Sequence, residues 1–390
     1  MNMIYLDNSA TTPISDAALK TYIEVSKEQF GNPSSLHTLG FQAEKVLKSA
    51  REGILSAIGD PTGTLVFTGS GSEANNLAIL GRAYAKERYK KGAKLITTLG
   101  EHASVTAPLK KLRTEGYEIA TIPTINGILD LAALERELTP NVILVSLMLV
   151  NNETGAIYDV GTAAAMIKRL APGAIVHVDA TQAFLKVPFS PKSLKADLIT
   201  VSSHKIEGPK GVGALYISPA VIKERGLSPI VLGGGQEGGL RSGTENVPAI
   251  AAFGTAASIS RAELGRRSKA LTELRSYLLE RLSEGVLCEI SPTLPPVSAP
   301  HILNLTLPHI KSETMLHFLS SKGICVSSGS ACSSNGAHHP SPALVAYGRS
   351  EEEADSSIRI SFSHHNTRAD VDALCEALAE GLGRLARVHA

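Results

Sequence analysis

The sequence predicts an α/β fold with a mainly parallel central sheet, helices on both of its faces and a smaller α+β domain. The chain has 390 residues, more than one hydrophobic core normally holds. From about residue 64, short apolar runs alternate with longer amphipathic runs, a pattern that favours parallel strands joined by helices. The run 143–150 is almost entirely apolar, as a strand buried on both faces requires. Ligands of such folds collect at the carboxyl ends of the strands.

Short apolar runs mark the expected strands, and helices are expected between them. The strands are predicted over 65–68, 94–98, 143–150, 174–180, 197–203 and 213–218. The helix after the first strand is expected to have Ser72 as its N-cap. Long helices follow over 247–284, and further strands and helices follow a Pro-rich connection. We expect 15–258 to form the large domain, and 1–14 with 259–390 to form the small domain.

Composition excludes several classes of protein. The net charge of +1 offers no electrostatic basis for binding nucleic acid or an anionic membrane. No apolar run reaches the length that spans a bilayer, and the N-terminus does not resemble a secretory signal, so we expect a cytoplasmic protein. None of the four cysteines forms a CxxC pair, which favours buried or reactive thiols over disulfides.

Three segments that follow predicted strands carry candidate chemistry. The Gly-rich run 68–76 opens a helix, so its free N–H groups favour a phosphate, although a tight turn explains the glycines equally well. Asp179 ends an apolar strand, where a buried carboxylate needs a cation such as the pyridinium nitrogen of pyridoxal 5′-phosphate (PLP); a helix cap is the alternative. Gln182 is placed to bond the ring hydroxyl.

The segment 202–211 presents two lysines. Lys205 directly follows an apolar strand, which suits a Schiff base with an aldehyde, and its neighbours Ser202 and His204 are candidate phosphate donors. Lys210 lies in a GPKG turn, where solvent exposure is the simpler interpretation.

The C-terminal part adds a thiol and a guanidinium. Cys332 lies among small and turn-forming residues, within a loop expected over about 325–342, so the thiol is either a mobile reactive group or an incidental surface cysteine. Cys325, in an apolar stretch, is expected to be buried and inert. Arg359 lies in a strand-like run and faces either a substrate carboxylate or a structural ion pair.

Taken together, these motifs resemble the cysteine desulfurases of the NifS/IscS type, within the class V family of PLP-dependent aminotransferases. The motifs span nearly the whole chain in the family's order: YLDNSATT (5–12), FGNPSSLH (30–37), GSEANN (71–76), EHAS (101–104), NNETG (151–155), HVDATQ (177–182), SSHKIEGPKG (202–211), RSGTEN (241–246), SSGSACSS (327–334) and SSIRIS (356–361).

The resemblance implies a fold-type I homodimer and a role for each matched residue. Lys205 would carry the Schiff base, His102 would stack on the cofactor ring, and Cys332 would accept sulfur from L-cysteine as a persulfide. The remaining cofactor-binding residues would be Gly71, Ser72, Asn152, Asp179, Gln182, Ser202, His204 and, from the other subunit, Thr244. Asn32, Asn152 and Arg359 would bind the substrate.

The sulfur would pass to an acceptor protein, such as an iron–sulfur scaffold or a tRNA-thiolation protein. A selenocysteine lyase, another class V enzyme and a catalytically silent assembly scaffold remain alternatives. The chain departs from the family pattern at Glu207 and at the two histidines of FSHHNT, which follows the last strand-like run. We expect no metal site, because the adjacent His338 and His339 on a polar loop are more often solvated.

Overall fold

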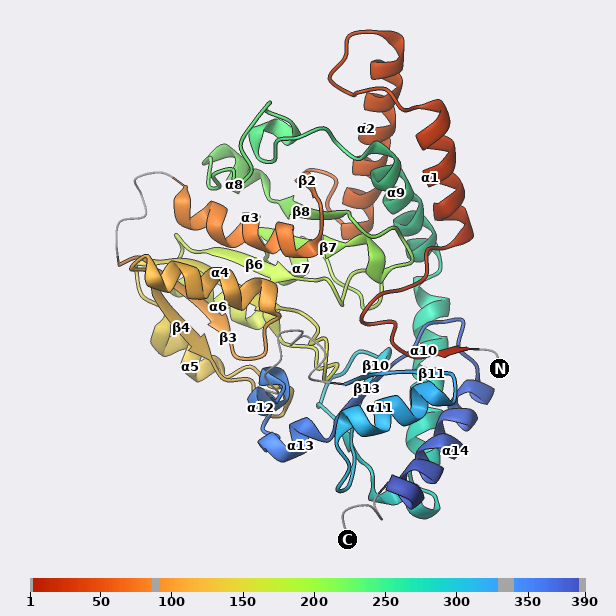
Figure 1. Ribbon diagram of the computed structural model, residues 1–390. Coiled ribbons are helices and arrows are strands. Elements are labelled where there is room, and N and C mark those ends of the chain that lie inside the picture. Colours follow the sequence, from red (N-terminus) through yellow and green to blue (C-terminus); the bar gives the residue numbers. More distant parts are fainter. Residues whose placement is uncertain (1–2, 86–91, 329–339, 386–390) are drawn as a thin grey trace.

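The computed structural model describes residues 3–85, 92–328 and 340–385 (Figure 1). A seven-stranded sheet has the strand order β2-β8-β7-β6-β5-β3-β4. Its strands are β2 (Thr64–Thr68), β3 (Lys94–Thr98), β4 (Glu118–Ile122), β5 (Val142–Met148), β6 (Ile175–Asp179), β7 (Leu198–Ser202) and β8 (Gly213–Ile217). Only β8 runs against its neighbours in this sheet, and the strands from β7 through β4 are parallel. This confirms the predicted fold class.

Side chains of the central strands enter two separate hydrophobic clusters. In β5, Val145 and Leu147 belong to a cluster that includes helix residues such as Phe253, whereas Leu144 belongs to a second cluster with Leu77. Every residue of β5 is buried, which explains its nearly continuous apolar sequence.

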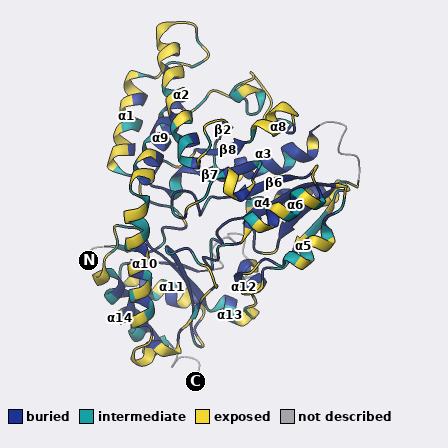
Figure 2. Cartoon of the chain, turned by 180° about the vertical axis from the view of Figure 1, so that it is seen from behind, coloured by how far each residue is buried: buried dark blue, intermediate teal, exposed yellow. Residues whose placement is uncertain are grey.

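Helices contribute to these two clusters. The helices of this part of the chain are α1 (Asp16–Glu28), α2 (Thr38–Ile58), α3 (Gly71–Tyr84), α4 (Ala103–Thr114), α5 (Leu131–Glu137), α6 (Val160–Leu170), α7 (Pro191–Leu194), α8 (Pro219–Lys223) and α9 (Val247–Ala262). In Figure 2 the central strands are dark blue, and the outer faces of α1 and α2 are largely exposed.

The C-terminal part has its own sheets and its own hydrophobic cluster. β12 (Ser327–Ser328), β13 (Ser357–Ser361), β10 (Ile302–Thr306) and β9 (Ser291–Thr293) form an antiparallel sheet, and β1 (Ile4–Tyr5) pairs in parallel with β11 (Ile324–Cys325). Its helices are α10 (Leu264–Arg281), α11 (Ser312–Ser321), α12 (Pro342–Tyr347), α13 (Glu351–Asp355) and α14 (Arg368–Leu385).

The N-terminal strand joins this C-terminal part, because Leu6 packs in the same cluster as Leu278 and Ile360 (Figure 1). The expected boundary at residue 258 falls inside α9, and the division into two domains stays a prediction. Among the described residues, no helix is both long and apolar enough to cross a membrane.

Two local expectations were wrong. The N-cap of α3 is Ser70, whose Oγ accepts from the Glu73 N–H over 3.1 Å, so Ser72 lies inside the first turn. Ser70 and Ser72 both stand at the start of the same amphipathic run and carry the same side chain. The sequence alone therefore does not show at which of the two serines the helical backbone begins. Cys325 is half-buried rather than buried, because its strand β11 pairs only with the short β1 in a separate two-stranded sheet.

Candidate active site

Turns at the carboxyl edge of the large sheet deliver polar residues to one cavity of about 390 Å³. Its lining includes Gly71 after β2, His102 after β3, Asn152 after β5, Asp179 at the end of β6, and Ser202, His204 and Lys205 around the end of β7. Parallel strands end at the same edge, which is why residues far apart in the sequence meet there. Ser72, Gln182 and Arg359 also line the cavity.

Asp179 is a buried carboxylate held only by neutral donors. Its Oδ2 accepts a hydrogen bond from Asn75 Nδ2 over 2.8 Å, and its Oδ1 accepts from the Thr181 N–H over 2.9 Å. The side chain does not cap a helix, since the next helix, α7, is capped by Ser190. A 5% exposed carboxylate that faces a cavity is suited to a cationic ligand group.

The N-terminal segment positions the Lys205 amine. Lys205 Nζ donates to the carbonyl oxygens of Ser9 and Ala10 over 2.6 and 2.7 Å. Gln182 Nε2 donates to the same Ser9 carbonyl over 2.8 Å. The rival Lys210 is exposed and is absent from the cavity lining.

One side of the cavity has the features of a phosphate site. Gly71 and Ser72 form the first turn of α3, whose backbone N–H groups favour an anion. The buried Ser202 Oγ has no hydrogen-bond partner. A Cβ added at Gly71 would lie 3.3 Å from Ser202 Cβ, so glycine keeps this approach open. Burial lowers the pKa of His204 to about 4, and Lys205 adds to that effect, so this imidazole is neutral.

His102 presents a partly buried ring to the same cavity. Its Nδ1 shares a hydrogen bond with Ser104 Oγ over 2.8 Å and accepts from the Ser104 N–H over 3.2 Å. Burial lowers the pKa of His102, and the nearby Asp179 carboxylate only opposes that shift. The fixed ring offers a flat surface for stacking.

Arg359 both forms a structural ion pair and lines the cavity, the two alternatives expected from the sequence. Its Nη2 pairs with Asp7 Oδ1 over 2.8 Å and its Nη1 donates to the Asn152 carbonyl over 2.9 Å, as in a structural ion pair. Its buried Nε has no partner, and the side chain lines the cavity beside Ser327 and Ser328. The two contacts use two of the five N–H groups of the guanidinium, so N–H donors remain for a substrate carboxylate.

Some predicted residues are not in this lining. Asn32 and Thr244 are exposed on the protomer surface and do not border the cavity. Cys332, His338 and His339 lie outside the described residues.

Sequence reasoning also missed contributors. Asn75 and Ser104 line the cavity, as do Ser9 and Ala10, whose carbonyl oxygens hold Lys205. Asn75 lies in the GSEANN motif and Ser104 lies in the EHAS motif, so both residues could have been predicted from the matched motifs. No local pattern indicated that the carbonyl oxygens at 9 and 10 would meet Lys205.

Comparison with known proteins agrees with this geometry. The aminotransferase class-V profile matches residues 4–374. The chain belongs to the aminotransferase class-V family. Cysteine desulfurase IscS 1 of Archaeoglobus fulgidus is 38% identical over 387 residues, covering 98% of each chain. Cysteine desulfurases of Nostoc and of Salmonella arizonae are also 38% identical, over 99% and 98% of this chain and 94% and 93% of their own lengths.

Solved structures of family members share the fold. A NifS-like protein superposes with a TM-score of 0.89 at 34% identity, over 98% of this chain and 100% of its own. A NifS-like protein from Rickettsia africae gives a TM-score of 0.85 at 31% identity, over 97% of this chain and 99% of its own. SspA in complex with cysteine gives 0.79 at 30% identity, over 93% and 100%.

Class V enzymes use PLP, and the residues present fit that cofactor. The buried Asp179 carboxylate suits the protonated ring nitrogen, and Lys205 supplies the amine for the aldehyde. Two buried polar atoms of the cavity-lining residues, Ser202 Oγ and Gln182 Oε1, have no hydrogen-bond partner and would be satisfied by polar groups of the cofactor. The chain is therefore a PLP-dependent enzyme of this family.

Proposed function

We propose that this chain is a cysteine desulfurase, which removes sulfur from L-cysteine, releases L-alanine and holds the sulfur as a persulfide on Cys332. The observation that carries the proposal is the convergence of Lys205, Asp179 and Arg359 on one cavity of about 390 Å³. The curated relatives at 38% identity are named cysteine desulfurases, which supports the same activity here.

Each end of the substrate meets a different group of the cavity. The Arg359 guanidinium lines the cavity and binds the substrate carboxylate, in competition with the Asp7 ion pair. Lys205 removes the Cα proton as general base and later returns a proton to carbon; the Ser9 and Ala10 carbonyls hold its amine in place. PLP, when bound, withdraws electrons from the substrate Cα, and Asp179 keeps its ring nitrogen protonated.

The sulfur transfer balances without an external oxidant. The Cys332 thiolate attacks the substrate sulfur, so an S–S bond forms while the Cβ–S bond breaks and its electron pair stays on carbon. Protonation of that carbon gives alanine. Each turnover leaves one sulfur on Cys332, which an acceptor thiol must remove before the next.

Chain connectivity supports the reach of this thiol. Ser328 borders the cavity and precedes Cys332 by four residues. Four residues span at most roughly 14 Å, so the length of chain after Ser328 is compatible with a thiol at position 332 that reaches the cavity.

We further infer a homodimer. Phe30, Leu36 and Leu232 are 67%, 105% and 80% exposed, an unusual extent for large apolar side chains. In the sequence, Phe30 and Leu36 lie on either side of Asn32, and Leu232 precedes Thr244 by 12 positions. Asn32 and Thr244 are the two predicted site residues outside this protomer's cavity. A dimer that covers these side chains brings both residues toward the partner's site. A fully active monomer in light scattering would refute this.

The acceptor is expected to be a protein with a free thiol, such as an iron–sulfur scaffold or a tRNA-thiolation protein. The activity itself is tested first, by measuring its products, before an acceptor is sought. Purified, PLP-loaded protein is incubated with L-cysteine and a reducing thiol, and alanine and sulfide are measured together. Equal amounts of the two products support desulfuration. Pyruvate without alanine, or transfer of the amino group to a keto acid, would favour another class V activity.

A further inference from the structure

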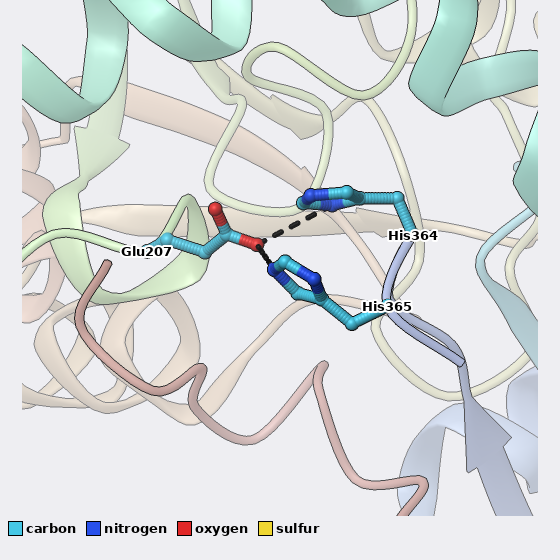
Figure 3. Close-up of side chains that lie close together, drawn as sticks. All are labelled: Glu207, His364 and His365. Carbon is cyan, nitrogen blue, oxygen red and sulfur yellow. Dashed lines mark ion pairs between the residues drawn. The ribbon is translucent and has the colours of Figure 1, made fainter. Parts of the chain in front are cut away.

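Glu207, His364 and His365, three positions that depart from the family pattern, meet in space (Figure 3). Glu207 lies two residues after Lys205, and the histidines follow β13, the strand that carries Arg359. Glu207 Oε1 lies 3.4 Å from His364 Nδ1 and 3.3 Å from His365 Nε2. All three ligand atoms lie within 4.8 Å of one another.

We propose that Glu207, His364 and His365 bind a divalent transition-metal ion, with Zn²⁺ as the best match, and that this ion ties the loop after Lys205 to the segment after Arg359. The donor set consists of two imidazole nitrogens and one carboxylate oxygen, the set that zinc takes in proteins. Two such ligands bound tetrahedrally at about 2.0–2.1 Å lie roughly 3.3 Å apart, which matches both measured separations.

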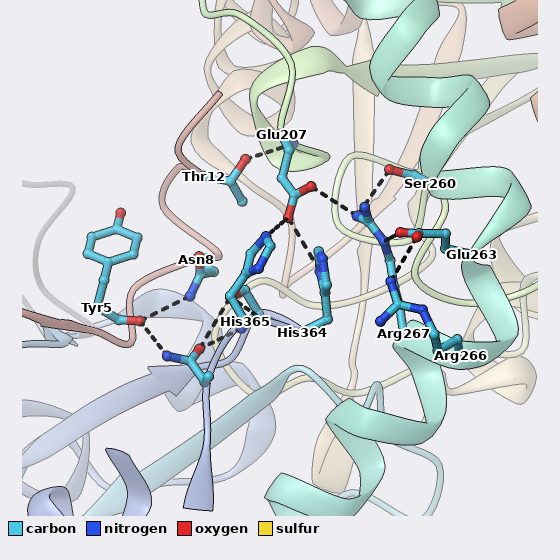
Figure 4. Close-up of polar contacts among 12 residues, drawn as sticks. Tyr5, Asn8, Thr12, Glu207, Ser260, Glu263, Arg266, Arg267, His364 and His365 are labelled. Atoms are coloured by element: carbon cyan, nitrogen blue, oxygen red, sulfur yellow. Dashed lines mark hydrogen bonds and ion pairs between the residues drawn. The ribbon is translucent and has the colours of Figure 1, made fainter. Parts of the chain in front are cut away.

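The remaining carboxylate oxygen is already held as a metal-bound carboxylate requires. Glu207 Oε2 accepts from Arg267 Nη1 over 3.1 Å (Figure 4). Arg267 is itself paired with Glu263 Oε2 over 2.9 Å, which offsets its charge beside a bound cation. A hydrogen bond to the second oxygen orients the ligand and fixes which oxygen faces the ion.

The backbone on both sides of the cluster is also anchored. The Glu207 N–H donates to Thr12 Oγ1 over 2.8 Å, and Glu207 has a φ of 66°, a left-handed conformation that side chains rarely adopt. On the other side, Asn366 Nδ2 donates to the Tyr5 carbonyl over 3.2 Å, and Asn366 Oδ1 accepts from the Ser363 N–H over 2.8 Å. The two ligand-bearing loops therefore start close to the binding geometry.

Access and coordination number also fit. The His365 side chain is 72% exposed, whereas those of His364 and Glu207 are each 10% exposed. An ion would enter from the exposed His365 side, where the His365 ring packs against that of His364 with centroids 3.9 Å apart. The solvent side leaves a fourth position for water, so the site has the three protein ligands and one water typical of an open zinc centre.

The test measures zinc binding to the full-length, tag-free, PLP-loaded chain. A Cys332→Ser background removes the reactive thiol as a competing ligand. Calorimetric titration with Zn²⁺ against a competing chelator is compared for this parent, His365→Ala and Glu207→Gln. The matched control is His317→Ala, because His317 is an exposed imidazole on α11 outside the cluster.

We expect one zinc ion per chain, bound at least about tenfold more weakly in His365→Ala and Glu207→Gln and unchanged in His317→Ala. Zinc should also raise the melting temperature of the parent but not of His365→Ala. His365 is exposed, so this variant tests the site even if Glu207→Gln fails to fold. No stoichiometric zinc in the parent, or equal affinity in His365→Ala, would leave only a hydrogen-bonded contact and overturn the proposal. The readouts are binding and unfolding, so they are independent of the proposed desulfurase activity.

Discussion

Asn75 and Asp179, 104 positions apart in the sequence, are joined by a buried hydrogen bond of 2.8 Å from Asn75 Nδ2 to Asp179 Oδ2. Asn75 Nδ2 also donates to Ser104 Oγ over 2.9 Å, and that hydroxyl in turn holds the His102 ring. One amide therefore orients both the carboxylate for the cofactor nitrogen and the ring expected to stack on the cofactor.

Asn75→Ala should weaken PLP binding by about ten- to a hundredfold, because a hydrogen bond to a charged group contributes roughly 1.5–3 kcal/mol. The dissociation constant of PLP, measured by equilibrium titration, checks this. Asn76→Ala is the matched control, since that side chain only donates to the Ser72 carbonyl. Equal PLP affinity in both variants would show that Asp179 needs no support from Asn75.

Lys205→Ala should bind PLP without a covalent link, because the amine nearest the cavity is removed. Borohydride reduction followed by peptide mapping should find PLP on the wild-type peptide that contains Lys205, and none on the variant. Lys210→Ala, at an exposed position, should keep the adduct. An adduct that survives Lys205→Ala and maps to Lys210 would move the Schiff base there.

Arg359→Ala should raise KM for L-cysteine by about ten- to a hundredfold while PLP still binds, because the guanidinium addresses the substrate carboxylate. The steady-state rate of alanine formation and the PLP dissociation constant separate the two effects. The alternative is that Arg359 serves only the structural ion pair with Asp7. An unchanged KM with a lower melting temperature would make Arg359 a structural residue.

Cys332→Ser should bind PLP and still change its absorption spectrum when L-cysteine is added, because neither step uses the thiol. Alanine formation should fall to near background, since a hydroxyl is a poor nucleophile beside a thiolate.

Mass spectrometry provides the complement to this variant. After a short pulse of L-cysteine, the wild type should carry one added sulfur on the Cys332 peptide and none on those of Cys288, Cys325 and Cys375. The half-buried Cys325 is the informative comparison, because it lies nearest in sequence. Wild-type alanine production by Cys332→Ser would exclude the persulfide mechanism.

Stability should fall as pH rises through the titration of Glu101. Burial raises the pKa of this carboxyl to about 8, with the Asp179 charge adding to the shift. The folded state therefore holds a proton that the unfolded chain releases near pH 4.5, so the stabilising contribution is complete below that pH and is lost by about pH 8.

Glu101→Gln keeps the shape and removes the titration. Its melting temperature should exceed that of the wild type at pH 8 and differ little at pH 5, as measured by thermal denaturation across this range. Parallel pH profiles for the two proteins would mean that Glu101 is ionised in the fold.

Local patterns predicted much of the fold and part of the site. Apolar runs correctly placed β5, β6 and β7, because strands covered on both faces must be apolar at every position. The ends of these runs then located Asp179 and Lys205 at the sheet edge. The same reasoning failed at the N-cap of α3, where Ser70 and Ser72 carry equivalent side chains and the backbone path selects Ser70.

The sequence by itself therefore determined which residue types stand at the ends of the strands, because burial of a parallel sheet and the chemistry of each side chain are local properties. Only the tertiary structure decided that the Ser9 and Ala10 carbonyls hold Lys205, that Asn75 supports Asp179, and that Glu207 meets His364 and His365. These partners lie far apart along the chain. Their contact depends on how the N-terminal segment and the C-terminal part pack against the large sheet, which no local periodicity encodes.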